Sequence, residues 1–273
     1  MSKTRALISR LPFTKSTPRV AVIRLQGTIG AGPRAALSDE AMGPVIEKAF
    51  RKGKPAAVAL VINSPGGSPV QSALIAARIR RLAEKHDIPV HAFVEDVAAS
   101  GGYWLACAAD DIWVDFGSIV GSIGVISAGF GAHVFLARQG IERRVHTAGT
   151  SKATLDPFQP EKKEDVARLK GLLEDMHGGF ISYVKSRRGD RLTSEQDLFN
   201  GEFWIGKRAI TLGLVDGEAH LVPKLQALYG EDVQLSHYGK KRGLFQRFGA
   251  SMAEDALSAI EERAEFARFG VRQ

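Results

Sequence analysis

Ser100 stands between an apolar stretch and two glycines, in the sequence AASGGYW at 98–104. A hydroxyl placed where a strand ends and a helix begins, beside backbone without side chains, suits a nucleophile whose attack creates an oxyanion. A second glycine pair, Gly66 and Gly67 in INSPGG (62–67), could supply further main-chain N–H donors. Each motif also has an ordinary explanation, because serine is a preferred helix N-cap and Ser-Pro-Gly-Gly is a common tight turn.

A serine nucleophile needs a base. None of the seven histidines lies between Ser100 and His133, and none has the glycine-rich or acid-paired setting of a catalytic triad. Lys152 is the remaining candidate, since it lies among small residues in AGTSKATLDPF (148–158). Burial of a lysine beneath a substrate disfavours its charged form, which is what a general base requires. The ordinary alternative is a solvated surface lysine.

The composition limits the other chemistries. The chain has 273 residues, 44% of them hydrophobic and 25% charged, which is typical of a folded protein with a real core. Cys107 is the only cysteine, so an internal disulfide and a multi-thiolate zinc site are excluded and a reducing compartment is indicated. We therefore expect a cytoplasmic location. Catalysis by a serine and a lysine would need no metal and no cofactor.

The net charge of +7 is carried by the ends of the chain. Residues 1–19 hold five bases and no acid, residues 238–273 hold seven bases and five acids, and the body between them is balanced at 25 and 25. A nucleic-acid-binding domain should instead carry a basic face on its fold, so nucleic acid is not an expected partner. No apolar run is long enough for a membrane span, although basic tails permit peripheral contact with the inner face of a membrane.

Apolar runs and helical patterns alternate along the body. We expect strands at 20–25, 56–63, 89–94, 111–114, 124–126 and 141–145, and helices at 37–50, 70–85, from about 100, 130–139, 161–185 and within 204–217. This alternation predicts an α/β fold with a mostly parallel sheet covered by helices. A loop at 147–160 interrupts it and carries Lys152.

The tail has a helical apolar pattern of its own. Its stripe ends in Ala264 and Ala267, which indicates an amphipathic helix that packs on protein, or in a second interpretation lies on a membrane surface. We expect three parts: a basic N-terminal tail (1–17), one α/β domain (18–237) and a C-terminal amphipathic helical tail (238–273).

Five motifs occur in the order found in the signal peptide peptidase A family of serine peptidases, peptidase family S49. They are INSPGG, AASGGYWLACAAD (98–110), GSIVGSIGVI (117–126), TSKATLDPF (150–158) and AITLGLVD (209–216). The similarity runs from about residue 20 to residue 222. The chain resembles the short, single-domain form of the family. It implies the fold shared by Clp protease and crotonase, a repeated ββα superhelix with mostly parallel sheets.

The resemblance also implies roles for particular residues. Ser100 would be the nucleophile and Lys152 the general base, and Ser122, rather than Ser118, would orient the lysine. The N–H groups of Gly66 and Gly101 would form the oxyanion hole. The second glycine of each pair, Gly67 or Gly102, would contact the substrate.

The implied function is endopeptidase cleavage of hydrophobic peptides, such as signal-peptide remnants or membrane-associated segments. The implied partner is a second copy of the chain, in a ring or dome such as an octamer, where Ser100 and Lys152 of one site can come from two subunits. Two alternatives remain at this point: an acyl-CoA enzyme of the crotonase type, which would need an acid or base in place of the Ser-Lys pair, and a non-catalytic oligomeric scaffold at a membrane.

Overall fold

The computed structural model describes residues 17–31, 36–149, 151–239 and 263–271. The strands in these ranges are β1 (Arg19–Gln26), β2 (Ala57–Ser64), β3 (Val90–Ala99), β4 (Asp111–Val114), β5 (Ile119–Gly121), β6 (Phe203–Ile205), β7 (Gly217–Glu218) and β8 (Gln234–Tyr238). They form one sheet in the order β6-β5-β3-β2-β1-β8, with β4 beside β3 and β7 beside β4. Every pairing is parallel except that of β5 with β6.

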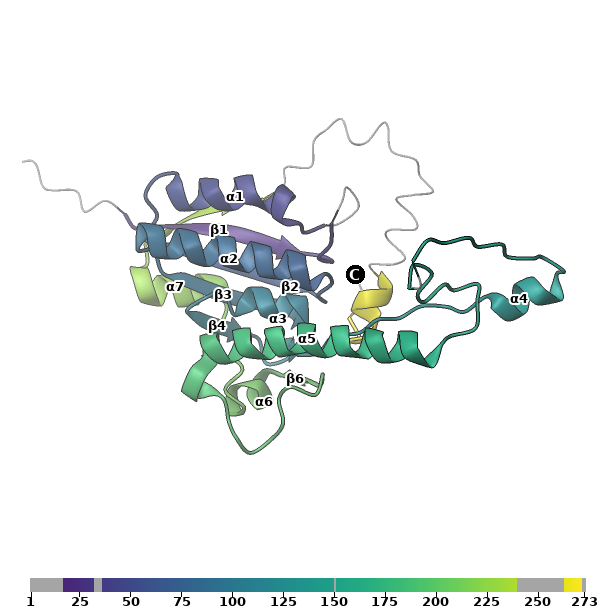
Figure 1. The fold of residues 1–273 in the computed structure, drawn as a ribbon. Coiled ribbons are helices and arrows are strands. Elements are labelled where there is room, and N and C mark those ends of the chain that lie inside the picture. Colours follow the sequence, from purple (N-terminus) through teal and green to yellow (C-terminus); the bar gives the residue numbers. More distant parts are fainter. Residues whose placement is uncertain (1–16, 32–35, 150, 240–262, 272–273) are drawn as a thin grey trace, which may run out of the picture.

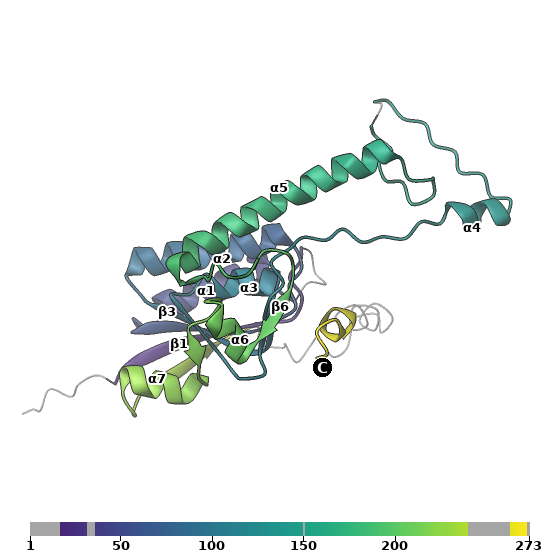
Figure 2. The ribbon, with the colours of Figure 1, turned by 90° about the horizontal axis from the view of Figure 1, so that it is seen from below.

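Helices cover the sheet unequally. They are α1 (Asp39–Arg51), α2 (Pro69–His86), α3 (Gly101–Ala106), α4 (His133–Arg138), α5 (Lys163–Arg188), α6 (Gly206–Thr211) and α7 (Leu221–Tyr229), with a 3-10 turn at Gly189–Arg191. The first three form a layer over one face, and α7 lies on the opposite side of the sheet from α5 (Figures 1 and 2). None of the helices in the described ranges combines the length and the hydropathy that crossing a bilayer requires.

The central strands are apolar on both faces, as parallel strands covered on two sides must be. All eight residues of β2 are buried. Along β1 the side chains alternate: Ile23 and Leu25 face the core beneath α1 and α2, whereas Val20 and Val22 pack in a smaller cluster with Leu225 of α7. The sheet therefore holds β3, whose end carries Ser100, between two buried layers.

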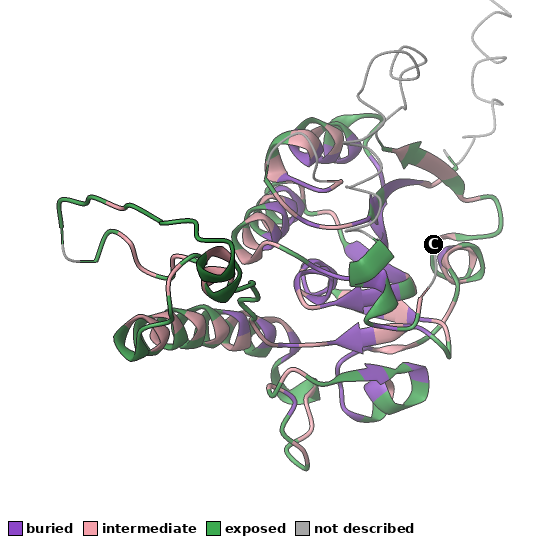
Figure 3. Ribbon diagram, turned by 90° about the vertical axis from the view of Figure 1, so that its right-hand side faces the viewer, coloured by how far each residue is buried: buried purple, intermediate pink, exposed green. Residues whose placement is uncertain are grey.

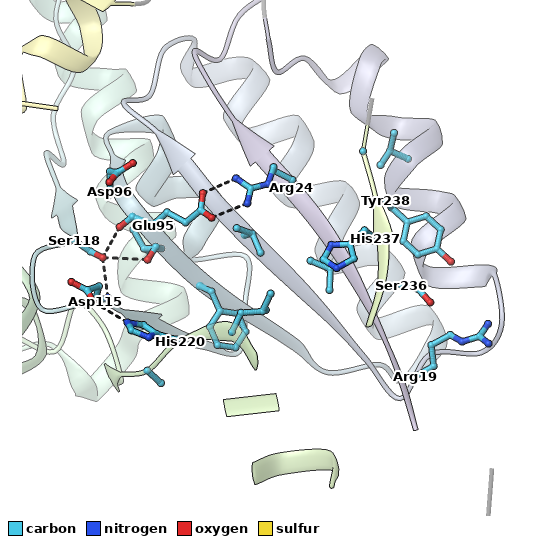
Figure 4. A pocket seen from close by; sticks show the side chains of 18 of the residues that line it. Arg19, Arg24, Glu95, Asp96, Asp115, Ser118, His220, Ser236, His237 and Tyr238 are labelled. Atoms are coloured by element: carbon cyan, nitrogen blue, oxygen red, sulfur yellow. Dashed lines mark hydrogen bonds and ion pairs between the residues drawn. The ribbon is translucent and has the colours of Figure 1, made fainter. Parts of the chain in front are cut away.

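Strand β3 divides its pairing between two partners. Its first half, up to Val94, pairs with β4, and its last three residues, from Val97, pair with β5. Ser118 closes the gap between these partners, because its hydroxyl donates to the carbonyl oxygen of Glu95 (2.6 Å) and accepts from the N–H of Asp115 (2.9 Å) (Figure 4). Ser118 is 1% exposed, so its hydroxyl has a structural role at this branch point.

The expected α/β fold with a mostly parallel sheet is confirmed. Two expected strands are wrong: 124–126 and 141–145 have no regular structure, and the strand after Val114 lies instead at β5. The expected helix within 204–217 begins only at Gly206, after β6. The parts of the expected tails at 1–16, 240–262 and 272–273 lie outside the described residues, and the three-part division of the chain stays a prediction.

Arg188 ties the end of α5 to the rest of the fold. Its buried guanidinium donates to the carbonyl oxygen of Gly213 (2.8 Å) and to the carboxylate of Asp216 (2.7 Å), which also accepts from the N–H of Ile112 in β4 (2.7 Å). Burial acts to raise the pKa of Asp216, but the hydrogen bond from Arg188 and the nearby positive charges outweigh it and hold that pKa below its ordinary value.

Replacing Arg188 with methionine is expected to lower the free energy of unfolding by about 3–5 kcal/mol, because a buried ion pair loses one partner. Urea unfolding measures this loss of stability. Arg144→Met is the control, because Arg144 pairs with Glu142 in solvent and that pair should contribute less than about 1 kcal/mol.

The stability that ionised Asp216 contributes is present above the unfolded-state pKa of about 3.9 and is lost below it. The wild type and Asp216→Asn should therefore converge in acid; a stability difference that grows in acid would contradict this pairing.

Candidate active site

Ser100 occupies a strained turn between β3 and α3. Its φ of 52° and ψ of −120° are unusual for a residue with a side chain. Although it stands at the N-cap position, its side chain makes no capping hydrogen bond. Its N–H donates to the carbonyl oxygen of Gly121 (2.8 Å), which holds the turn against the end of β5. The ordinary N-cap explanation therefore fails, and the strain, which costs about 1–3 kcal/mol, indicates a functional position.

The two glycine pairs meet at this turn. Gly66 has a φ of +108°, and a side-chain carbon on it would lie 2.9 Å from both the Cβ of Ser100 and the nitrogen of Gly101. A side-chain carbon on Gly102 would collide with the carbonyl oxygen of Ser64. Only glycine allows the loop after β2 to approach the loop after β3 this closely.

The N–H groups at this contact differ in their partners. The buried N–H of Gly66 donates to Ser64 Oγ in a long hydrogen bond of 3.3 Å. The N–H groups of Gly67 and Gly101 donate to no acceptor within the described part of the chain. Gly67 is exposed and lines a cavity, whereas Gly102 is buried against Ser64 and does not line it.

That cavity, of about 610 Å³, contains both Ser100 and Ser122, and we call it the Ser100 cavity. Ser122 also has a positive φ, of 51°, and its N–H donates to the carbonyl oxygen of Glu202 (2.7 Å). Beyond these two serines, the cavity has polar lining from Ser127, Asn200, Glu265 and Arg268. Its apolar lining comes from Val125, Ile126, Leu169, Leu173, Met176 and Phe269. The sequence pattern did not indicate the contributions of α5 and the C-terminal residues, because the chain brings them in from remote positions.

Lys152 lies elsewhere. It belongs to the arm, defined as residues 127–149 and 151–162, which leaves the body after β5, carries α4 at its far end and returns to the start of α5 (Figures 1 and 2). Lys152 is exposed and does not line the Ser100 cavity. The structure thus brings Ser100, Ser122 and the glycines together within one chain, but not Lys152.

The arm lies in solvent. No residue of it is buried (Figure 3), yet it carries large apolar side chains, including Phe130, which is 94% exposed, and Phe135, which is 62% exposed. It has contacts of its own, since the N–H of Ala132 donates to the carbonyl oxygen of Pro157 and Arg143 pairs with Asp156 (3.0 Å). Apolar patches of this kind are typical of protein–protein contact.

A larger cavity, of about 1350 Å³, lies along β1, β3 and β8, and neither Ser100 nor Ser122 lines it (Figure 4). Of the GSIVGS motif, only Gly117 and Ser118 line this larger cavity. An ion pair between Arg24 and Glu95 (2.7 Å) and a contact between His220 Nε2 and the Asp115 carboxylate (2.9 Å) lie in its lining. No cluster of metal-ligating side chains occurs anywhere in the described ranges.

A strained serine at the carboxyl end of a parallel strand, next to main-chain N–H groups without an acceptor in the described chain, has the features of a serine hydrolase with an α/β fold. Within that class the chain belongs to peptidase family S49, whose model matches residues 83–228. The family expected from the five motifs is confirmed. The expected class of enzyme is the one that this peptidase family implies.

Curated relatives agree on the family. A candidate protease of Synechocystis sp., slr0021, is 33% identical over 206 residues, which cover 75% of this chain and 72% of that protein. A SohB protease of Haemophilus influenzae is 30% identical over 88% of this chain and 67% of its own length. A Brucella melitensis protein named as the Na(+)/H(+) antiporter NhaA is 46% identical over 95% of this chain. The chain spans only 38% of that relative's length.

Solved structures confirm the fold. The 1510-N membrane-bound stomatin-specific protease, as a lysine-to-alanine mutant in complex with a substrate peptide, superposes with a TM-score of 0.52 at 16% sequence identity. The match covers 90% of this chain and 98% of that one. A serine-to-alanine mutant of the same protease gives a TM-score of 0.51.

Proposed function

We propose that the chain is a serine endopeptidase that uses Ser100 and Lys152 as a dyad. The observation that carries this proposal is the strained, uncapped Ser100, which lies in a cavity beside main-chain N–H groups that have no acceptor among the described residues. In the reaction, neutral Lys152 takes the hydroxyl proton as Ser100 Oγ attacks a peptide carbonyl, and then gives that proton to the leaving amine. A water molecule activated by the same lysine hydrolyses the acyl-enzyme.

The oxyanion that forms on attack needs two or more donors. Gly66 and Gly101 are the pair proposed from the motifs, and Gly66 would have to give up its long hydrogen bond to Ser64 Oγ (3.3 Å). Gly67 joins them because its N–H has no acceptor within the described chain and the residue lines the Ser100 cavity. Losing one such donor typically costs about 2.7–4 kcal/mol of transition-state stabilisation. Ser122 shares the cavity with Ser100 and would accept a hydrogen bond from the lysine, which fixes the direction of its amine.

Lys152 is proposed to act in the Ser100 cavity of a neighbouring subunit. The arm supports this, because it holds Lys152 away from the body of its own subunit. It also exposes apolar side chains, and their burial against a second copy would stabilise the association of the two subunits. Such a contact is heterologous and closes into a ring or dome. In this arrangement an isolated subunit is inactive.

The proposed substrates are hydrophobic peptides in extended form, of the kind left by signal peptides or membrane-associated segments. The apolar lining of the Ser100 cavity supports this class. Val125 and Ile126 line the cavity outside any strand, and their N–H groups donate to no acceptor among the described residues. An extended peptide can therefore pair with this edge by strand addition. The cytoplasmic location and peripheral membrane contact stay predictions.

An internally quenched peptide with an apolar centre tests this function. The wild type should cut it internally, as product masses would establish, and should cut a matched peptide with charged residues at the centre at least about tenfold more slowly. It should not hydrate an enoyl-CoA thioester. Failure to cleave any such peptide, together with no labelling of Ser100 by a fluorophosphonate, would favour the scaffold alternative instead.

A further inference from the structure

The C-terminal turn, residues 263–271, packs against the strand that presents the nucleophile. Phe266 is fully buried in a cluster with Val97 and Ala99 of β3, directly before Ser100. Phe269 packs edge-on against Phe203 of β6, with 5.2 Å between ring centroids. Two aromatic side chains three residues apart thus fix one face of this turn to the body.

The sequence pattern pointed to a different face. Ala264 and Ala267, which end the apolar stripe of the tail, are both exposed. The helical turn closes after Ala267, where Gly270 has a φ of +74° and the N–H of Val271 donates to the carbonyl oxygen of Phe266. Glycine at this position is a common helix terminator. The turn is therefore a structured unit with its own cap and two anchors.

Three residues of this turn line the Ser100 cavity. Phe269 is 8% exposed and contributes the apolar part, while Glu265 and Arg268 pair with each other (3.0 Å) and are about half exposed. Leu173 and Met176 of α5 line the same cavity. An apolar side chain of a peptide bound at Ser100 would therefore lie between α5 and Phe269.

We propose that the C-terminal turn is one wall of the substrate pocket, in which Phe269 limits the size of the apolar side chain accepted beside Ser100. Phe266 is a positioning residue that holds this wall against β3. The inference rests on the proposed peptidase function, and it adds a specificity determinant from a part of the chain more than 160 residues from the nucleophile.

The position of the wall can be tested without catalysis. A Phe203→Cys/Phe269→Cys variant should be linked efficiently by a short bifunctional thiol reagent, because the two side chains touch. Cys107 should not compete, since it is buried and burial raises its pKa to about 12. The control is Phe203→Cys/Val222→Cys, whose second thiol lies on α7. Linking no faster than in this control would overturn the inference.

Specificity is the second test, with paired peptides that differ only in a large or small apolar side chain at the cleavage position. Phe269→Ala should shift the ratio of their kcat/KM values toward the large side chain by about 10-fold or more, and Phe266→Ala should shift it the same way. Val222→Ala, an exposed change on α7, should leave it unchanged. An unchanged ratio in Phe269→Ala, despite efficient linking, would overturn the size-limiting role.

The two failures are distinguishable. If the wild type hydrolyses no peptide, the proposed function fails, and the same ratio is then measured as peptide Kd values in the Ser100→Ala background. A shift of the Kd ratio on adding Phe269→Ala supports the wall as part of a binding pocket. No shift, or no peptide binding at all, overturns it.

Discussion

Ser100→Ala is expected to lower kcat/KM for an apolar peptide by at least about 10⁴-fold, because removing the nucleophile of a serine hydrolase leaves only binding and oxyanion stabilisation. Ser194→Ala is the matched control, since Ser194 is exposed and lines neither cavity. It should retain nearly full activity. Activity within about tenfold of wild type in Ser100→Ala would exclude Ser100 as the nucleophile.

Stability provides a second measure of the same position. Ser100 has a φ of 52° and a ψ of −120°, and glycine adopts such angles without the cost that a Cβ imposes. Ser100→Gly should therefore be inactive yet more stable than Ser100→Ala, by about 1 kcal/mol in urea unfolding. An inactive variant of equal or lower stability would contradict the strain that we assign to this turn.

The sequence was most informative where short-range patterns decide the structure. Uninterrupted apolar runs predicted β1 and β2. The glycine pairs were expected to supply main-chain donors, and the structure adds that Gly66 and Gly102 allow the loops after β2 and β3 to approach each other at Ser100. The order of the five motifs indicated the family, which the spacing of apolar residues alone does not identify.

The sequence was least informative where long-range packing decides. Ile141 and Val145 suggested a strand at 141–145, but this segment lies in the arm, where no strand of the described chain pairs with it. Phe266 and Phe269 were outside the apolar stripe of the tail. Their burial is explained by their packing against β3 and β6. Strand and helix patterns report a half-buried face, not the partner that covers it.

The separation of Lys152 from the Ser100 cavity leads to the second large effect. Lys152→Ala should lower kcat/KM about as far as Ser100→Ala, because without the amine no group takes the hydroxyl proton. Lys152→Arg should not restore activity, since a guanidinium does not lose its proton at working pH. Lys162→Ala, a change of another exposed lysine on the arm, is the matched control and should remain active.

Mixing the two inactive variants distinguishes a shared site from an internal one. When Ser100→Ala and Lys152→Ala subunits are dissociated and reassembled together in equal amounts, about a quarter of the sites should combine an intact serine with an intact lysine from its neighbour. Mixing Ser100→Ala with the double variant should give no activity, because no intact serine is then present. A dyad contained within one subunit predicts no recovery in either mixture. Recovery in the first mixture alone would therefore assign the exposed arm its role: it delivers the base to the next subunit, and assembly is the step that completes the site.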